Sequence, residues 1–119
     1  MSTTPFFVYI LICENNNFYT GYTTNLIRRY QEHVLGTGKC KYTRSFKPIN
    51  IAQSWQINES KSVAMKIEKF IKKMTKKEKE QLLLNPENLS QLFTDATGTK
   101  SLIVPYYFSA QKISMLSCE

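Results

Sequence analysis

The sequence predicts a single α/β domain in which a small three-stranded antiparallel sheet is flanked by three to four helices. Three short runs rich in β-branched and aromatic residues predict the strands, over 6–13, 18–22 and 49–57. Apolar residues recur at helical spacing over 25–35 and 61–73. With 119 residues and 42% hydrophobic side chains, the chain is large enough for one core, and extensive disorder is not expected.

The first two predicted strands form a hairpin. The run Asn15-Asn16-Asn17 marks its turn, because asparagine tolerates left-handed backbone angles. Positions 9 and 19 of an antiparallel pair share a face only when the loop holds an odd number of residues. A three-residue turn with Asn in the left-handed position meets that condition. We therefore predict that Tyr9 and Tyr19 point from the same face of the sheet.

The first helix is expected over 25–35, capped by Thr23 or Thr24. Arg29 and His33 are four residues apart, so they stack on a stripe beside the apolar contacts of this helix. Those contacts are Leu26, Tyr30 and Val34.

The second helix is expected over 61–73, opened by Ser60 or Ser62. Its core-facing residues follow helical spacing and are Val63, Ile67, Phe70, Ile71 and Met74. Thr75 caps a third helix over 76–84, and Pro86 fits the first turn of a short fourth helix that ends near residue 93.

The C-terminal part of the sequence is expected to differ from the rest. Residues 94–99 are small and polar, as in a linker, and 102–108 form either a docked edge strand or a loosely held tail. Pro105 argues against a central strand, because proline cannot donate to a β-ladder. We therefore assign residues 1–93 to the domain and 94–119 to an extension of unknown role.

Basic residues are concentrated in the middle of the chain. Sixteen Lys and Arg stand against nine Asp and Glu, a net charge of +7, and residues 28–79 hold fourteen of the basic residues but four acidic ones. This polarity indicates a positive face and a polyanionic partner, although a helix surface that only makes the fold soluble would give the same count.

Other partners and compartments are less consistent with the sequence. The basic helices lack a Trp/Phe-rich opposite face, so membrane binding is not expected, and no stretch approaches eighteen apolar residues. The first residues lack the pattern of a signal peptide. Cys13, Cys40 and Cys118 are widely spaced, which supports neither a zinc site nor a disulfide framework, and free thiols suit the reducing cytoplasm.

A small set of side chains suits the hydrolysis of a phosphodiester, which needs a proton acceptor and charge to offset the developing dianion. Glu68 can hold one Mg²⁺ or Mn²⁺ ion, which retains several waters. Arg29 can grip two phosphate oxygens, and Tyr19 can take a proton from water beside a cation. His33 and Tyr9 can orient the water or the phosphate.

These residues stand in a recognisable order. Ten residues separate the tyrosines of Val8-Tyr9-Ile10 and Tyr19-Thr20-Gly21, ten more lead to Arg29, and four more lead to His33. The set resembles the GIY-YIG nucleases, closest to the small stand-alone bacterial members, and is similar to the catalytic domain of the excision-repair nuclease UvrC. The resemblance covers about residues 5–84.

The resemblance implies a GIY-YIG-like fold and a role for each residue. Tyr19 would be the general base and Tyr9 a partner in its hydrogen-bond network. Arg29 would bind the scissile phosphate, His33 would assist at the phosphate or water, and Glu68 would hold the single metal ion. The residues predicted to contact nucleic acid, DNA in the first place, are Lys39, Lys41, Tyr42, Arg44 and Lys72.

Two departures from the family leave an alternative open. Position 22 is Tyr, where repair-type members have a lysine, and no Asn after Glu68 matches one that some members use. We expect a DNA endonuclease of structure-directed or weakly sequence-specific action, possible roles being repair or recombination. The alternative is a catalytically weak or inactive nucleic-acid-binding protein on this scaffold. An adaptor that docks a partner through 102–108 is a third class.

Each residue also has a purely structural interpretation. The two tyrosines are typical of half-buried strand aromatics, and Arg29 and His33 are compatible with a solvated helix surface. Glu68 and Lys72 are spaced for an ion pair on one helix. Chemistry is favoured because these independent explanations would all have to coincide at the spacings of one family.

Overall fold

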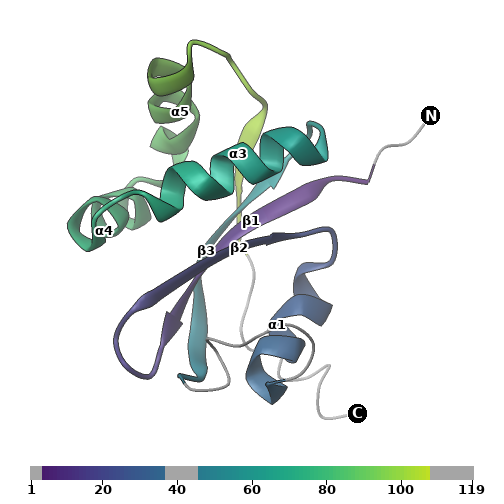
Figure 1. Cartoon of the computed structure of the whole chain (residues 1–119), viewed down its shortest axis with the longest axis vertical. Coiled ribbons are helices and arrows are strands. Elements are labelled where there is room, and N and C mark those ends of the chain that lie inside the picture. The colour runs from purple at the N-terminus through teal and green to yellow at the C-terminus, as the bar shows by residue number, and fades with distance from the viewer. Residues whose placement is uncertain (1–3, 37–45, 108–119) are drawn as a thin grey trace.

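A computed structural model describes residues 4–36 and 46–107 as an antiparallel sheet with helices on both faces (Figure 1). The sheet has four strands in the order β2-β1-β3-β4. The strands are β1 (Phe6–Cys13), β2 (Phe18–Thr23), β3 (Pro48–Ile57) and β4 (Ile103–Tyr106).

The β1–β2 hairpin has the predicted odd-numbered turn. The N–H of Cys13 donates to the carbonyl of Asn17 at 2.9 Å, and within the three enclosed residues Asn16 has a φ of 63°. The resulting register places Tyr9 and Tyr19 on the same face of the sheet, which confirms the prediction.

The two faces of the sheet are covered by different helices. Helix α1 packs on the face to which Tyr9 and Leu11 point, and the remaining helices pack on the face to which Val8 and Ile10 point (Figure 1). The helices are α1 (Leu26–Leu35), α3 (Lys61–Lys72), α4 (Lys76–Leu84), the 3₁₀-helix η1 (Pro86–Asn88) and α5 (Leu89–Thr97).

The expectation of three strands is wrong, because β4 adds a fourth strand at the edge of the sheet. Residues 103–106 pair antiparallel with β3, and Ser54 donates its hydroxyl to the carbonyl of Tyr106. Pro105 is tolerated because an edge strand has one side without a ladder partner. The alternative of a docked edge strand is therefore the one that the structure shows.

The expected linker is also wrong over residues 94–97, which continue α5. Thr94 donates its hydroxyl to the carbonyl of Ser90, and Thr97 donates to that of Phe93, both at 2.8 Å. These bonds let small polar residues remain in a helix. The helix therefore runs past residue 93, the expected end of the domain, and ends at Gly98, which has a φ of 73°.

The capping predictions are confirmed for α3 and α4 and wrong for α1. Ser60 accepts the N–H of Val63, and Thr75 forms a capping box at the start of α4. At α1 the side chain of Asn25, rather than that of Thr23 or Thr24, accepts a helix N–H.

Helix α1 is also rotated relative to the predicted core stripe. Leu26 and Tyr30 are buried as predicted, but Val34 is 37% exposed and His33 is fully buried in its place. The buried positions thus follow a spacing of four and three residues instead of four and four, and both are compatible with one helix face. Among the helices of the described residues, none is long and apolar enough to cross a membrane.

Candidate active site

An open pocket of about 580 Å³ lies at the β2 edge of the sheet, and we call it the tyrosine pocket. Tyr9 and Tyr19 reach it from the strands, Arg29 reaches it from α1, and Glu68 reaches it from α3. Helices α1 and α3 cover opposite faces of the sheet, so side chains from both helices can meet in the pocket only at the sheet edge. Its other lining residues are Phe6, Gly21, Tyr22, Thr23, Thr24, Arg28, Glu32 and Lys61.

His33 lies behind the two tyrosines and does not line the tyrosine pocket. The hydroxyl of Tyr9 and Nε2 of His33 share a buried hydrogen bond of 2.8 Å. The ring of Tyr19 meets the imidazole edge-on, with 4.9 Å between ring centroids. The interpretation of His33 as a solvated helix residue is therefore wrong, since it supports both phenols from within the core.

The buried imidazole of His33 is neutral at pH 7. Burial, together with the smaller effect of the charge of Arg29, lowers the pKa of His33 from 6.5 to about 4, and the charge of Glu32 partly opposes this shift. A neutral imidazole can donate from one ring nitrogen and accept at the other. It can thus hold the Tyr9 hydroxyl without adding a positive charge to the core.

Gly21 creates the space that the Tyr9 ring occupies. A Cβ atom at this position would lie 2.5 Å from the Tyr9 hydroxyl oxygen and 3.3 Å from a ring carbon of Tyr19. The sequence alone does not show this contact, because the cross-strand register, which pairs Gly21 with Tyr9, decides which side chain approaches the glycine. Gly21 is thus required for the packing of the tyrosine pair.

Arg29 is held beside the tyrosine pocket by Glu32, one turn along α1. Nη1 of Arg29 lies 2.9 Å from Oε1 of Glu32, and Nε of Arg28 lies 4.0 Å from the other carboxylate oxygen. The side chain of Arg29 is 23% exposed, so it is fixed in position but reachable. Glu32 was not among the predicted site residues, although its i,i+3 spacing from Arg29 could have indicated this contact.

Glu68 meets both of its predicted descriptions. Its carboxylate lies 3.6 Å from the ammonium of Lys72, as expected for an ion pair, and it also lines the tyrosine pocket. The Glu68 side chain is 15% exposed, whereas that of Lys72 is 50% exposed. The partner of Glu68 is therefore solvated, and the carboxylate can exchange it for a metal ion.

The donor chemistry of the pocket fits Mg²⁺ or Mn²⁺ better than zinc. Within the described residues, no three His, Cys, Asp or Glu side chains gather as a possible metal site. Magnesium needs no such cluster, because it keeps several waters and takes one or two carboxylates. The single carboxylate of Glu68 is enough to meet that requirement.

The remaining predicted nucleic-acid-binding residues are described only in part. Lys39, Lys41, Tyr42 and Arg44 lie outside the described residues. Lys72 is half-exposed on α3.

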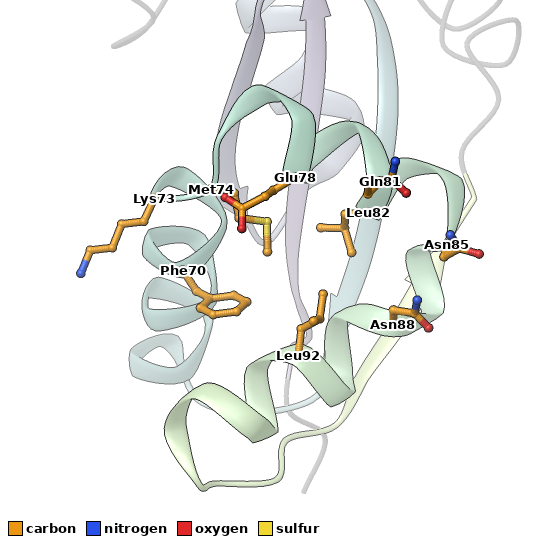
Figure 2. A pocket seen from close by; sticks show the side chains of 9 residues that line it. All are labelled: Phe70, Lys73, Met74, Glu78, Gln81, Leu82, Asn85, Asn88 and Leu92. Carbon is orange, nitrogen blue, oxygen red and sulfur yellow. The ribbon is translucent and has the colours of Figure 1, made fainter.

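A second concave site lies between α3, α4 and α5 and has a volume of about 530 Å³ (Figure 2). The side chains of Phe70, Met74, Leu82 and Leu92 make most of its lining apolar (Figure 2). Its one carboxylate, Glu78, accepts the backbone N–H of residue 75 in the capping box of α4. This apolar groove shares no lining residue with the tyrosine pocket.

Comparisons with known proteins identify a family and several relatives. The GIY-YIG catalytic domain family matches residues 5–81. The chain is 38% identical over 85 residues to UPF0213 protein lmo0166 of Listeria monocytogenes. The matched region covers 71% of this chain and 92% of that protein. It is 42% identical over 77 residues to UPF0213 protein BH0048 of Halalkalibacterium halodurans, with coverages of 65% and 80%.

A solved structure is also similar. The solution NMR structure of UPF0213 protein BH0048 from Bacillus halodurans matches at 38% identity with a TM-score of 0.44. The match covers 71% of this chain and 92% of that chain.

Proposed function

The chain belongs to the GIY-YIG family, and from that premise we propose that it is a metal-dependent endonuclease that hydrolyses the phosphodiester bonds of DNA. The observation that carries the proposal is the convergence of Tyr19, Arg29 and Glu68 on one open pocket. A phenol, a guanidinium and a carboxylate together supply a proton acceptor, a phosphate clamp and a metal ligand.

The proposed mechanism assigns one task to each side chain. Tyr19 takes the proton of the attacking water, and its ring is held by its edge-on contact with His33. Arg29, fixed by Glu32, binds the scissile phosphate and offsets its developing charge. Glu68 would hold the metal ion, which when bound polarises the phosphoryl oxygen and neutralises charge.

Tyr9 and His33 act one step away from the chemistry. The hydrogen bond between them fixes the Tyr9 ring against Gly21, beside Tyr19. Arg28, Arg29 and Lys61 favour an anion at the pocket, whether a phosphate or a phenolate.

The proposed substrate is DNA recognised by its structure or with weak sequence specificity, and repair and recombination are the processes this fits. A single small domain has little surface for reading base edges, while phosphate contacts carry no sequence information. Comparing cleavage of branched, nicked and plasmid DNA tests this point. Efficient cutting at one sequence in every substrate shape would contradict it.

The alternative function, binding of nucleic acid with little or no cleavage, is favoured by one observation. Tyr22 lines the tyrosine pocket at the position where repair-type members of the family have a lysine. The rest of the pocket would then bind phosphate without activating water. Metal-independent DNA binding without detectable nicking would support this alternative.

The deciding experiment is plasmid nicking with Mg²⁺, with Mn²⁺ and with a chelator. Tyr19→Phe, Arg29→Ala and Glu68→Gln are each expected to lower the rate by about 10²-fold or more, because each removes a group that acts in the transition state. Thermal unfolding of each variant checks that it is folded.

Matched control variants make the same or a similar change away from the tyrosine pocket: two repeat Tyr→Phe and Glu→Gln, and the third removes a lysine charge in place of an arginine charge. Tyr107→Phe, Lys100→Ala and Glu87→Gln alter exposed residues and are expected to retain the full rate. Equal residual cleavage by all three pocket variants would indicate a contaminating nuclease and would contradict the proposal.

A further inference from the structure

A basic groove adjoins the tyrosine pocket on the outer face of α3. It has a volume of about 440 Å³ and is lined by Lys61, Ser62, Met65, Lys66 and Lys69, and we call it the lysine groove. Lys61 lines both the lysine groove and the tyrosine pocket, so the two sites are continuous.

The three lysines of the groove are not neutralised by the fold. Within the described residues no ion pair involves Lys61, Lys66 or Lys69, and no acidic side chain lines the groove. Other lysines are engaged: Lys72 pairs with Glu68, and Lys76 donates to the carbonyl of Asn16 at 2.7 Å. The lysine groove thus concentrates positive charge that is available to an anionic ligand.

The position of these lysines on α3 follows from helical periodicity. Ala64, Ile67 and Ile71 are fully buried against the sheet, so the lysines are left on the exposed side of the same helix. Met65, which is 37% exposed, adds an apolar contact among the charges. The groove therefore offers both charge and a small apolar surface.

The length of the groove matches a stretch of nucleic-acid backbone. From Lys61 to Lys69 the helix rises about 12 Å, at about 1.5 Å per residue. A DNA strand presents one phosphate for about every 3.4 Å along the duplex axis. The groove can therefore contact about three phosphates, one for each lysine.

We propose that the lysine groove binds the sugar-phosphate backbone of the substrate beyond the scissile phosphate. Lys61 marks the point where the strand leaves the tyrosine pocket, and Lys66 and Lys69 follow it along α3. The Ser62 hydroxyl can donate to a phosphate oxygen, and Met65 can pack against a sugar. The inference rests on the proposed function, because it extends the path of the same substrate.

The residue types indicate how such a groove recognises DNA. Lysine is a compact point charge without the planar fork with which arginine reads guanine. Three lysines therefore fit backbone binding that is independent of sequence. This agrees with cleavage directed by the shape of the substrate.

The test compares two variants with the same change in net charge. Lys61→Gln/Lys66→Gln/Lys69→Gln removes the groove charges, and Lys73→Gln/Lys77→Gln/Lys100→Gln removes three lysines that line neither the groove nor the tyrosine pocket. Affinity for labelled duplex DNA is measured by fluorescence anisotropy over a salt series in chelator, where no cleavage occurs.

The expected result is a change in the salt dependence of binding. Each phosphate contact contributes about −0.9 to the slope of log K against log salt, so the groove variant should lose about 2.7 from that slope. The control variant should keep the wild-type slope. Equal slopes for the two variants would overturn the inference. It would also be overturned if the groove variant lost as much affinity for polyglutamate as for DNA, because an acidic protein would then fit the groove as well.

A second measurement separates failure of this inference from failure of the proposed function. Lys66→Gln/Lys69→Gln should raise the enzyme concentration for half-maximal cleavage but keep the single-turnover rate at saturation, whereas Tyr19→Phe should keep binding and lose the rate. Binding that depends on the groove without any cleavage by wild type would contradict only the nuclease. Cleavage by wild type that is indifferent to the groove would contradict only the groove.

Discussion

The two faces of the sheet make contrasting use of the same strand. Val8 and Ile10 of β1 point into an apolar core with α3, α4 and α5, whereas Tyr9 between them points toward α1 and bonds to His33. Alternate residues of a strand face opposite sides, so one strand supports both environments. Adjacent residues of β1 therefore have different roles: Val8 and Ile10 stabilise the apolar core, whereas Tyr9 lines the candidate active site.

The two concave sites repeat this contrast. The tyrosine pocket gathers phenols, guanidinium groups and a carboxylate at the β2 edge, while the groove between α3 and α5 is lined mostly by apolar side chains (Figure 2). Volume does not distinguish them, because both enclose roughly equal space. What makes the tyrosine pocket the candidate active site is the chemistry of its lining.

The largest effect is expected from a methyl group placed against Tyr9, on the face of the sheet that α1 covers. Gly21→Ala places Cβ 2.5 Å from the Tyr9 hydroxyl oxygen, so Tyr9 must shift, and we expect this to weaken its bond to His33. We expect a loss of about 3 kcal/mol in the free energy of unfolding, at the upper end for overpacking, and a large loss of nicking. Denaturant unfolding and plasmid nicking measure the two effects.

A second glycine provides the control for this prediction. Gly98 has a φ of 73°, and no atom of the residues that the structure describes lies within 4 Å of an added Cβ, so Gly98→Ala should cost about 1 kcal/mol through backbone strain alone. Its nicking rate should match wild type. If Gly21→Ala and Gly98→Ala lose the same activity, the loss does not come from a clash between the added methyl group and Tyr9.

The next effect depends on pH. The pKa of His33 is about 4 in the folded protein and about 6.5 when the chain unfolds, so the unfolded state binds more protons between these values. Stability is therefore complete above pH 6.5 and declines as the pH falls toward 4, by about 1–2 kcal/mol at pH 5. Chemical denaturation from pH 7.5 to about 5 measures this slope.

His33→Gln is the matched variant, because its side-chain amide can still bond to Tyr9 but does not titrate. His33 is the only histidine in the chain, so no other imidazole contributes in this range. The slope above pH 5 should become shallower in His33→Gln. An unchanged slope would show that the buried imidazole does not carry the dependence.

The main fold elements could be predicted because their signals are local. The apolar runs predicted three strands, and the Asn-rich turn predicted the odd loop that Asn16 closes at a φ of 63°. Strand β4 could not be assigned, because four residues including Pro105 gain their strand structure only by pairing with β3. Residues 94–97 were missed because hydroxyl–carbonyl bonds do not show in hydropathy.

The sequence predicted which residues form the candidate site, but it did not predict how deeply each of them is buried. The resemblance to the GIY-YIG nucleases implied that Tyr9, Tyr19, Arg29 and Glu68 belong to one site, and all four line one pocket. The burial of His33 depends on how far α1 is rotated when its apolar residues pack, and two rotations fit the sequence equally well. Lys61 was missed because its place at the pocket depends on where α3 begins relative to β2.

The smallest effect should come from an unpaired hydroxyl on the face of the sheet that α3, α4 and α5 cover. Thr20 lies on β2 between Tyr19 and Gly21, and its buried hydroxyl oxygen has no hydrogen-bond partner among the described residues. Thr20→Val replaces that hydroxyl with a methyl group of similar size, so it should raise the free energy of unfolding by about 1 kcal/mol without lowering nicking. Thr23→Val is the control: Thr23 Oγ1 accepts the N–H of Asn25 at 3.1 Å, so losing it should destabilise the fold. If Thr20→Val also destabilises the protein, its hydroxyl contributes to the fold, and the face covered by α3, α4 and α5 is not purely apolar at β2.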